Sequence, residues 1–476
     1  MAIALAIFLC FACGYLIVAL LWPPSSRTSS LALRASLSFG YGLGIFSAIY
    51  FLAKVFSLPV IATDFVVSIA IGAACFLRRT RHAVTRCEPA NDDVALPNWL
   101  GLLLKAAFAL SLGSAIYSAV MRAIAHPHGD GWDAFAIWNL HARFFFRSGN
   151  QWSDGLSPLI PWSHPDYPPL LPAVIAHFWT YAGHETPAVP AFIGLAFAFS
   201  TLAVLYFSLV RLRGPNAAML GFITLATTPF FIEQGASQYA DVPLSFFFLA
   251  SVALLSLHDQ PYRNAAARGF LVLAGLAIGF AAWTKNEGSL FLFATFGAFL
   301  IFFIRSRRRK VPAEESQSRL TAWSTPATLL LGMAPVLVLI LWFKHLAPRG
   351  DLFPEQAIML QKILTPDRYW AIVKWYAKEY LRFGGWWPIP ATVLLPALYF
   401  AAGRRKIDAP RPWVFVAVWT LAITLAGYFA IYVITPNELY WHLRFSLNRL
   451  FLQLWPSAVY LFFSSVSFRF VRNVSK

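Results

Sequence analysis

Long apolar runs, separated by short polar segments, follow one another along the whole chain. A helix needs about 20 mostly apolar residues to cross a bilayer, and about thirteen runs approach that length. They lie near residues 2–22, 31–53, 59–77, 99–124, 188–210, 215–232, 241–257, 269–283, 288–304, 325–343, 387–403, 412–434 and 449–468. This pattern predicts an all-α polytopic membrane protein with about 13 transmembrane helices.

The composition supports the same fold class. Of the 476 residues, 58% are apolar and 12% are charged, whereas about 25% of an average soluble protein is charged. Phe and Trp are abundant, as expected for side chains that face lipid or anchor helices at its surface. A water-soluble fold of this size cannot hide so much apolar surface.

The net charge of +17 does not require a nucleic-acid partner, because the basic residues cluster in one alternating set of loops. These clusters lie at 27–34, 78–86, 211–213, 263–268, 305–310, 404–406 and 469–476. The positive-inside rule assigns such loops to the cytoplasm. We therefore expect an outer N-terminus and a cytoplasmic C-terminus, most simply in a bacterial inner membrane.

Three long polar segments lie on the opposite face, at residues 125–187, 344–386 and 435–448. Long structured loops gathered on one side indicate a chemical site there. We divide the chain into N-terminal helices with a cytoplasmic basic loop (1–98) and a membrane catalytic domain (99–476).

The first outer segment contains two candidate acidic groups, Asp130 and Asp133. Residues 133–147 mix aromatic and basic positions, which predicts an amphipathic helix at the membrane surface. Asp133 stands near its start, where a carboxylate can act simply as a cap, and Asp130 between glycines suits a turn. Either carboxylate is also placed for catalysis.

A second candidate pair, Asp166 and Tyr167, stands in the run His-Pro-Asp-Tyr-Pro-Pro at 164–169. The prolines fix backbone angles before a further apolar helix. Such a stiff segment either holds the two side chains for substrate recognition or serves only as a rigid turn.

Three ionisable residues fall at helix ends where burial is costly without a partner. Asp241 begins an apolar helix, while Lys285 and Glu287 occupy the tip of a tight helical hairpin. The conservative interpretation is an ion pair of Lys285 with Glu287 or Asp241. The alternative is a lysine that binds a phosphate.

The last outer segment carries His442, Arg444 and Arg449 directly before the final apolar run. Arg449 follows His442 by two helical turns, so both are expected on one face. Arginines on the outer side suit a phosphate or pyrophosphate, although snorkelling interfacial arginines are the plain alternative.

Outer carboxylates and outer cations together fit a lipid-linked phosphorylated donor. The cations would hold the leaving phosphate while a carboxylate deprotonates an acceptor hydroxyl. No zinc-protease, Walker or nucleophile-elbow motif is present.

Two other classes of function fit less well. A transporter or flippase of lipid-linked sugars should carry an internal repeat and ionisable groups deep in the membrane. No repeat is found, and Asp64 and Lys105, within or close to predicted spans, have no obvious partner. A structural protein of an envelope complex would leave the outer charges without a role.

The order of motifs resembles the GT-C class of polyprenyl-phosphate-dependent glycosyltransferases. The closest branch is glycosyltransferase family 39, with the protein O-mannosyltransferases and the lipid A aminoarabinose transferase. The resemblance rests on Asp133 with Ala142-Arg143, Gly-Asn-x-Trp at 149–152, Pro-Pro-Leu at 168–170, Asp-Val-Pro-Leu at 241–244, and Thr-Lys at 284–285 after a Gly-x-Ala-x-Gly helix. It covers about residues 100–300.

This resemblance implies a GT-C-like bundle that transfers a sugar from a polyprenyl-phosphate donor, such as an undecaprenyl phosphate sugar. It implies a catalytic Asp133, with Asp130 as the alternative alignment. Asp241 would match a second acidic site, Lys285 a position near the donor phosphate, and Arg449 an arginine before the last span. The acceptor would be a lipid, glycan or protein hydroxyl, and a divalent cation (Mg²⁺ or Mn²⁺) is left open.

Overall fold

Helices form the regular structure of the protein, and the described residues contain no strand. A computed structural model describes residues 2–22, 28–79, 96–258, 268–308, 317–350, 355–386, 389–402 and 412–466. The prediction of an all-α polytopic membrane protein is confirmed.

The helices of the first half are α1 (Ala2–Leu21), α2 (Thr28–Val55), α3 (Val60–Arg79), α4 (Asn98–Ala125), the π-helical turn η1 (Ala134–Trp138), α5 (Asn139–Arg147), the 3₁₀ turns η2 (Gly149–Leu156) and η3 (Pro161–Ser163), α6 (Leu170–Ala182), α7 (Ala188–Arg213), α8 (Pro215–Ala226) and α9 (Pro229–Ala236).

The helices of the second half are α10 (Asp241–His258), α11 (Arg268–Thr284), α12 (Asn286–Arg308), α13 (Gln317–Leu346), α14 (Gln356–Ile363), α15 (Pro366–Tyr380), the 3₁₀ turn η6 (Phe383–Gly385), α16 (Ala391–Ala402), α17 (Pro412–Ile434) and α18 (Leu439–Ser465).

Within the described residues, each of the thirteen predicted apolar runs overlaps a helix or a helix pair; residues 387–388, 403 and 467–468 of these runs lie outside them. Among the described residues, nine helices are long and apolar enough to cross a membrane, and the bent pair α8–α9 would make a tenth. The pair bends by 67°, so the predicted run at 215–232 is a broken helix. The runs at 269–283 and 387–403 correspond to the shorter apolar helices α11 and α16.

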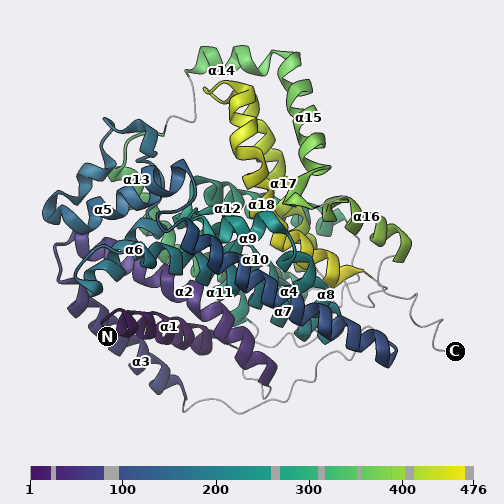
Figure 1. Cartoon of the computed structure of the whole chain (residues 1–476), viewed down its shortest axis with the longest axis horizontal. Helices are drawn as coiled ribbons and strands as arrows, with labels where there is room; N and C mark the ends of the chain where they lie inside the picture. Colours follow the sequence, from purple (N-terminus) through teal and green to yellow (C-terminus); the bar gives the residue numbers. More distant parts are fainter. Residues whose placement is uncertain are drawn as a thin grey trace.

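Helix α10 forms the centre of the bundle (Figure 1). It packs against α7, α11 and α18, while α11 packs against α13 and α12 packs against α17. Of its eighteen residues, all except the terminal His258 are buried. Aromatic rings fill the space around it, and Phe248 stacks on Phe291 with a centroid distance of 3.9 Å.

The N-terminal helices lie against the same bundle and are not a detached unit. Figure 1 shows α1, α2 and α3 along its lower side. Helix α2 packs against α6 and α7, and α1 packs against α2. The Tyr41 hydroxyl of α2 donates to the Leu273 carbonyl of α11 at 2.7 Å, which ties α2 to the centre.

Arg213, at the C-terminal end of α7, binds the end of α18. Its Nη1 donates to the carbonyls of Phe463, Ser464 and Val466 at 3.3, 3.2 and 2.8 Å. A cation satisfies carbonyls that have no partner in the last turn of a helix. Other basic residues on which the predicted membrane orientation rests lie outside the described residues: Arg27, Arg81, Arg86, Arg263, Arg309, Lys310, Arg404, Arg405, Lys406, Arg469, Arg472 and Lys476.

Candidate active site

The Asp241 carboxylate is fully buried and holds the centre of a charged network. It begins α10, and three side chains from elsewhere in the chain converge on it. Lys285 Nζ lies 3.2 Å from Oδ1, and Gln453 Nε2 donates to the same oxygen at 2.6 Å. Burying a carboxylate is costly unless it is paired and hydrogen-bonded, and both conditions are met here.

Arg449 completes the surroundings of Asp241 and connects it to Asp133. Its Nε donates to Asp241 Oδ2 at 2.7 Å, and its Nη2 donates to Asp133 Oδ2 at 2.6 Å. The guanidinium also lies over the ring of Tyr239, 4.7 Å from its centroid. One side chain of α18 therefore joins two acidic positions that are 108 residues apart in the sequence.

Lys285 stands in the break between α11 and α12 and also pairs with Glu287, with a distance of 2.7 Å from Nζ to Oε1. The sequence left Glu287 and Asp241 as alternative partners, and Lys285 binds both. Its ammonium lies 5.8 Å from the centroid of the Tyr167 ring. Tyr167 stacks in turn on His164 and Trp138.

Asp133 is carried at the start of η1, and the predicted helix over 133–147 is confirmed as η1 followed by α5. The Asp133 side chain makes no cap hydrogen bond to the helix; it turns to Arg449 instead. The preceding turn needs Gly129 and Gly131, which have φ of +88° and +96°. A Cβ on Gly129 would lie 2.3 Å from that of Ala134.

Gln238 fixes this turn from the other side. Its Nε2 donates to the Pro127 carbonyl at 3.0 Å, while its Oε1 accepts from Asn139 Nδ2 at 2.9 Å. Gln238 itself has a φ of +61°, a conformation unusual for a residue with a side chain. The loop before α10 and the start of α5 are thus held together next to Asp133.

Asp130 does not join the network. Its carboxylate forms an ion pair with Arg122 at the end of α4, and Arg122 also approaches Glu233 at 3.9 Å. Both partners of the Asp130 pair are about one-third exposed. Of the two alternatives that the sequence left open, Asp133 is the one that the fold places beside Arg449.

Asp166 belongs to a second polar group next to the first. Asn286 Nδ2 donates to Asp166 Oδ2 at 2.7 Å, and Lys344 Nζ donates to the Asp166 carbonyl at 2.7 Å and to Asn286 Oδ1 at 2.8 Å. These bonds join the rigid 164–169 segment to the start of α12 and the end of α13. They fix the chain directly before Tyr167 and directly after Lys285.

His442 and Arg444 lie away from the network. His442 Nδ1 lies 2.8 Å from Thr435 Oγ1, and its ring packs 4.9 Å from that of Tyr432. Arg444 is exposed, with its guanidinium over the ring of Phe445. Helix α18 is continuous from Leu439 to Ser465, as the sequence predicted, but Arg449 is the residue of the three that reaches Asp241.

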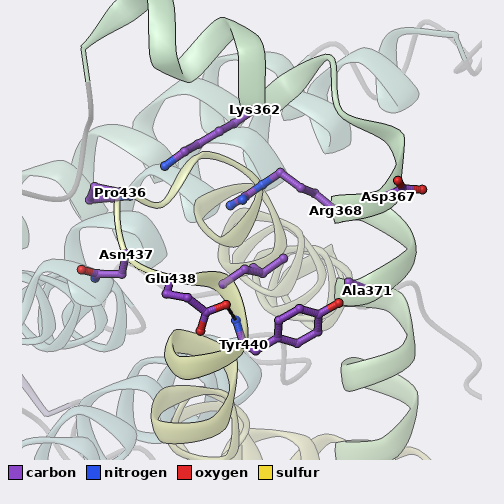
Figure 2. Close-up of a pocket in the computed structure, with 9 residues that line it drawn as sticks. Lys362, Asp367, Arg368, Ala371, Pro436, Asn437, Glu438 and Tyr440 are labelled. Carbon is purple, nitrogen blue, oxygen red and sulfur yellow. Dashed lines mark hydrogen bonds between the residues drawn. The ribbon is translucent and has the colours of Figure 1, made fainter.

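A cleft of about 390 Å³ opens at the beginning of α18, where α14 and α15 cross the loop between α17 and α18. Figure 2 shows Lys362 and Arg368 pointing towards this loop, and Glu438 bonded to the backbone of Tyr440. Arg368 donates to the Tyr432 and Val433 carbonyls at 3.0 and 2.9 Å.

Three charged side chains of this cleft bind backbone groups at the ends of helices. Lys362 and Arg368 satisfy carbonyls at the end of α17, and Glu438 accepts from two backbone N–H groups at the start of α18. These bonds lower the pKa of Glu438. Leu439 and Arg449 are ten residues apart, about 15 Å along a helix, so the cleft and the charged network are distinct.

The charged network retains hydrogen-bonding capacity for a ligand. Arg449 binds the two aspartates through Nε and Nη2, and Nη1 makes no bond within the described part of the chain. Lys285 has three N–H donors and two carboxylate partners. The Asp133 side chain is 19% exposed, so a ligand can approach it.

The described residues contain no group of three His, Cys, Asp or Glu side chains placed to hold a metal ion. The carboxylates of Asp133 and Asp241 bind Arg449 instead. The residues present do not fit the divalent cation that the resemblance left open, and no step of the chemistry below passes through one.

Four residues that contact the candidate site were not predicted from the sequence: Gln453, Tyr239, Asn286 and Lys344. Gln453 carried a signal, since it is an amide within an apolar run and lies four residues after Arg449, on the same helix face. Its Oε1 accepts from the Tyr428 hydroxyl at 2.6 Å. Burial and the nearby Asp133 carboxylate raise the pKa of Tyr239 to about 12, so this phenol stays protonated.

We predict that Asp241→Asn strongly destabilises the protein, because it leaves the buried cations Lys285 and Arg449 without their shared carboxylate. Breaking a buried pair in this way costs about 3–5 kcal/mol. Thermal unfolding of the purified protein in detergent measures the loss. The matched control is Glu185→Gln, which breaks the exposed pair with Arg147 and should cost at most about 1 kcal/mol. Equal effects of the two substitutions would contradict this account of the network.

A second prediction concerns pH, through His141 of α5. Burial and nearby His164 lower its pKa to about 4, against about 6.5 when unfolded. The unfolded state therefore binds the proton first as the pH falls. Stability is full above about pH 6.5 and decreases by about 3 kcal/mol down to about pH 4. His141→Gln should flatten this part of the curve of melting temperature against pH; parallel curves for both proteins would contradict it.

Comparison with known proteins agrees with the motifs that lie around this site. Residues 164–341 match the family described as dolichyl-phosphate-mannose-protein mannosyltransferase. No curated protein and no solved structure matches the chain. The matched region includes Tyr167, Asp241 and Lys285, while Asp133 and Arg449 lie outside it. The predicted resemblance is thereby confirmed over residues 164–341, where the chain is similar to a family of membrane glycosyltransferases of the polyprenyl-phosphate-sugar type.

Proposed function

We propose that the protein transfers a sugar from a polyprenyl-phosphate donor to a hydroxyl group of a lipid, glycan or protein, with inversion at the anomeric carbon. The observation that carries this proposal is the bridge that Arg449 forms between Asp133 and Asp241, beside Lys285. It sets a partly exposed carboxylate next to two cations that retain free donors. A base and a phosphate-binding pair are the two parts that such a transfer needs.

Asp133 is the general base in this proposal. Its Oδ2 is held by Arg449, and its Oδ1 makes no hydrogen bond to a described residue, so Oδ1 is available to an acceptor hydroxyl. The arginine orients the carboxylate. As the acceptor oxygen bonds to the anomeric carbon, its proton passes to Asp133.

Lys285 and Arg449 stabilise the leaving group. The bond between the anomeric carbon and the phosphate oxygen breaks, and the departing polyprenyl phosphate gains negative charge. Cations fixed before the reaction stabilise charge that develops in the transition state. Asp241, which accepts a further bond from Gln453, holds these cations in place from the buried side.

The site works at the periplasmic surface of a bacterial inner membrane in this proposal. The compact basic clusters then lie in the cytoplasm, with the N-terminus outside and the C-terminus inside. Asp166, Tyr167 and Glu287 border the donor position, since they contact Asn286 or Lys285 directly. His442 and Arg444, on the first turns of α18, line the approach from the outer surface.

We predict that Asp133→Asn lowers kcat by about 100-fold or more, because a positioned base contributes about 10²–10⁴-fold. The assay is release of polyprenyl phosphate from short-chain polyprenyl-phosphate sugars, with the mannose donor first in the panel. Asp130→Asn is the matched control, since this carboxylate pairs with Arg122 outside the network, and it should keep most of the activity.

Thermal unfolding of both variants shows whether they remain folded. Full activity of a folded Asp133→Asn protein would exclude Asp133 as the base. Loss in Asp130→Asn alone would move the base to Asp130. Donor binding without turnover by the wild type would favour transport of the lipid-linked sugar over transfer.

A further inference from the structure

Asp64 has an unusual place on α3. Among residues 60–77 of this helix, whose burial the structure describes, it is the one fully buried residue. Its neighbours Phe65, Val66 and Ile69 are 41%, 66% and 69% exposed. A membrane helix that turns most of its apolar surface outwards thus inserts a single carboxylate into the protein. An ionisable group at such a place needs partners and suggests a specific role.

The partners of Asp64 both belong to α6. His177 Nε2 lies 2.8 Å from Asp64 Oδ2, and the Tyr181 hydroxyl donates to the same oxygen at 2.9 Å. His177 and Tyr181 are one helical turn apart and so share a face. The expectation that Asp64 has no partner is therefore wrong, because the fold brings α6 against α3. Asp64 Oδ1 and His177 Nδ1 stay buried without a bond to any described residue.

Helix α6 connects this contact to the charged network. It begins at Leu170, three residues after Tyr167, and His177 follows about 10 Å along its axis. Tyr167 faces Lys285, and the carbonyl and carboxylate of Asp166 bind Lys344 and Asn286. Prolines 168 and 169 make the link between helix and site stiff. A shift of α6 would therefore move Tyr167 relative to Lys285.

The N-terminal helices hold the neighbouring α5 as well. The Tyr50 hydroxyl of α2 donates to the Phe145 carbonyl at 3.2 Å, and the rings of Tyr50 and Phe46 pack against His177. Helix α5 follows η1, which begins directly after Asp133. Helices α5 and α6, which follow the segments of Asp133 and Tyr167, thus both rest on α2, and α6 also packs against α3.

We propose that Asp64 is a positioning residue for the transfer reaction: through α6 it fixes Tyr167 beside Lys285. This inference rests on the proposed function. It also gives the helices within residues 1–98 a role in catalysis, whereas the sequence-based division of the chain placed catalysis in residues 99–476.

The test compares two substitutions at Asp64. Both α6 partners bind one oxygen, so Asp64→Asn keeps an acceptor for them and removes only the charge, whereas Asp64→Leu removes both bonds. We expect Asp64→Leu to lower kcat by about 10–100-fold, the scale of a small misplacement of reacting groups, with the KM for the donor nearly unchanged. Asp64→Asn should stay within about threefold of the wild type.

The substitution His177→Phe tests the contact between Asp64 and α6 from the side of α6. If Asp64 acts through α6, His177→Phe lowers kcat as Asp64→Leu does, and the double variant loses little more. Ile69→Ala, on the exposed side of α3, is the matched control and should behave as the wild type. Hydrogen exchange of residues 164–182 should rise in Asp64→Leu but not in Asp64→Asn or Ile69→Ala.

The inference is overturned if folded Asp64→Leu keeps its kcat, or if its activity falls only as its folded fraction falls while exchange of residues 164–182 is unchanged. If the wild type transfers no sugar from any donor of the panel, the proposed function fails. Hydrogen exchange still tests the contact of Asp64 with α6 in that case, because the measurement needs no turnover. Equal exchange of residues 164–182 in wild type and Asp64→Leu would refute the proposed role of Asp64.

Discussion

The arrangement of the site depends on compensating one carboxylate that has no contact with solvent. Asp241 requires cations and donors within a mainly apolar bundle, since an unpaired buried charge would cost several kcal/mol. Lys285 supplies one from the junction of α11 with α12, and Arg449 and Gln453 supply the others from α18. The requirement fixes how the start of α10, the junction of α11 with α12, and α18 meet, and Arg449 extends the same constraint to Asp133.

The fold meets this constraint by gathering helix breaks at one end of the bundle. The break between α11 and α12 frees Lys285, the turn before α10 places Tyr239 and Gln238, and η1 carries Asp133. Short helices connect these points, with prolines that restrict the backbone and glycines that allow the tight turns. Residues that bind substrate in a membrane protein need polar surroundings, and helix ends provide them without exposing backbone groups to lipid.

Much of the fold followed from the sequence, because apolar length and the loops between runs report directly on membrane helices. The same reasoning named Asp133, Asp241, Lys285 and Arg449 among its candidates, since ionisable residues at apolar helix ends are unusual enough to notice. It could not choose between Asp130 and Asp133, because that choice depends on how α4 and α18 face the turn. The partners of Asp64 were also hidden, since α3 and α6 are about a hundred residues apart and meet only through tertiary packing.

A structure of the protein in lipid nanodiscs with a short-chain polyprenyl phosphate bound would show whether Lys285 and Arg449 bind the donor phosphate. We expect phosphate oxygens within about 4 Å, the range of an ion pair, of both Lys285 Nζ and the Arg449 guanidinium, with Asp133 facing the position of the sugar. A phosphate held elsewhere, such as in the cleft of Lys362 and Arg368, with the Asp241 network unchanged, would contradict it.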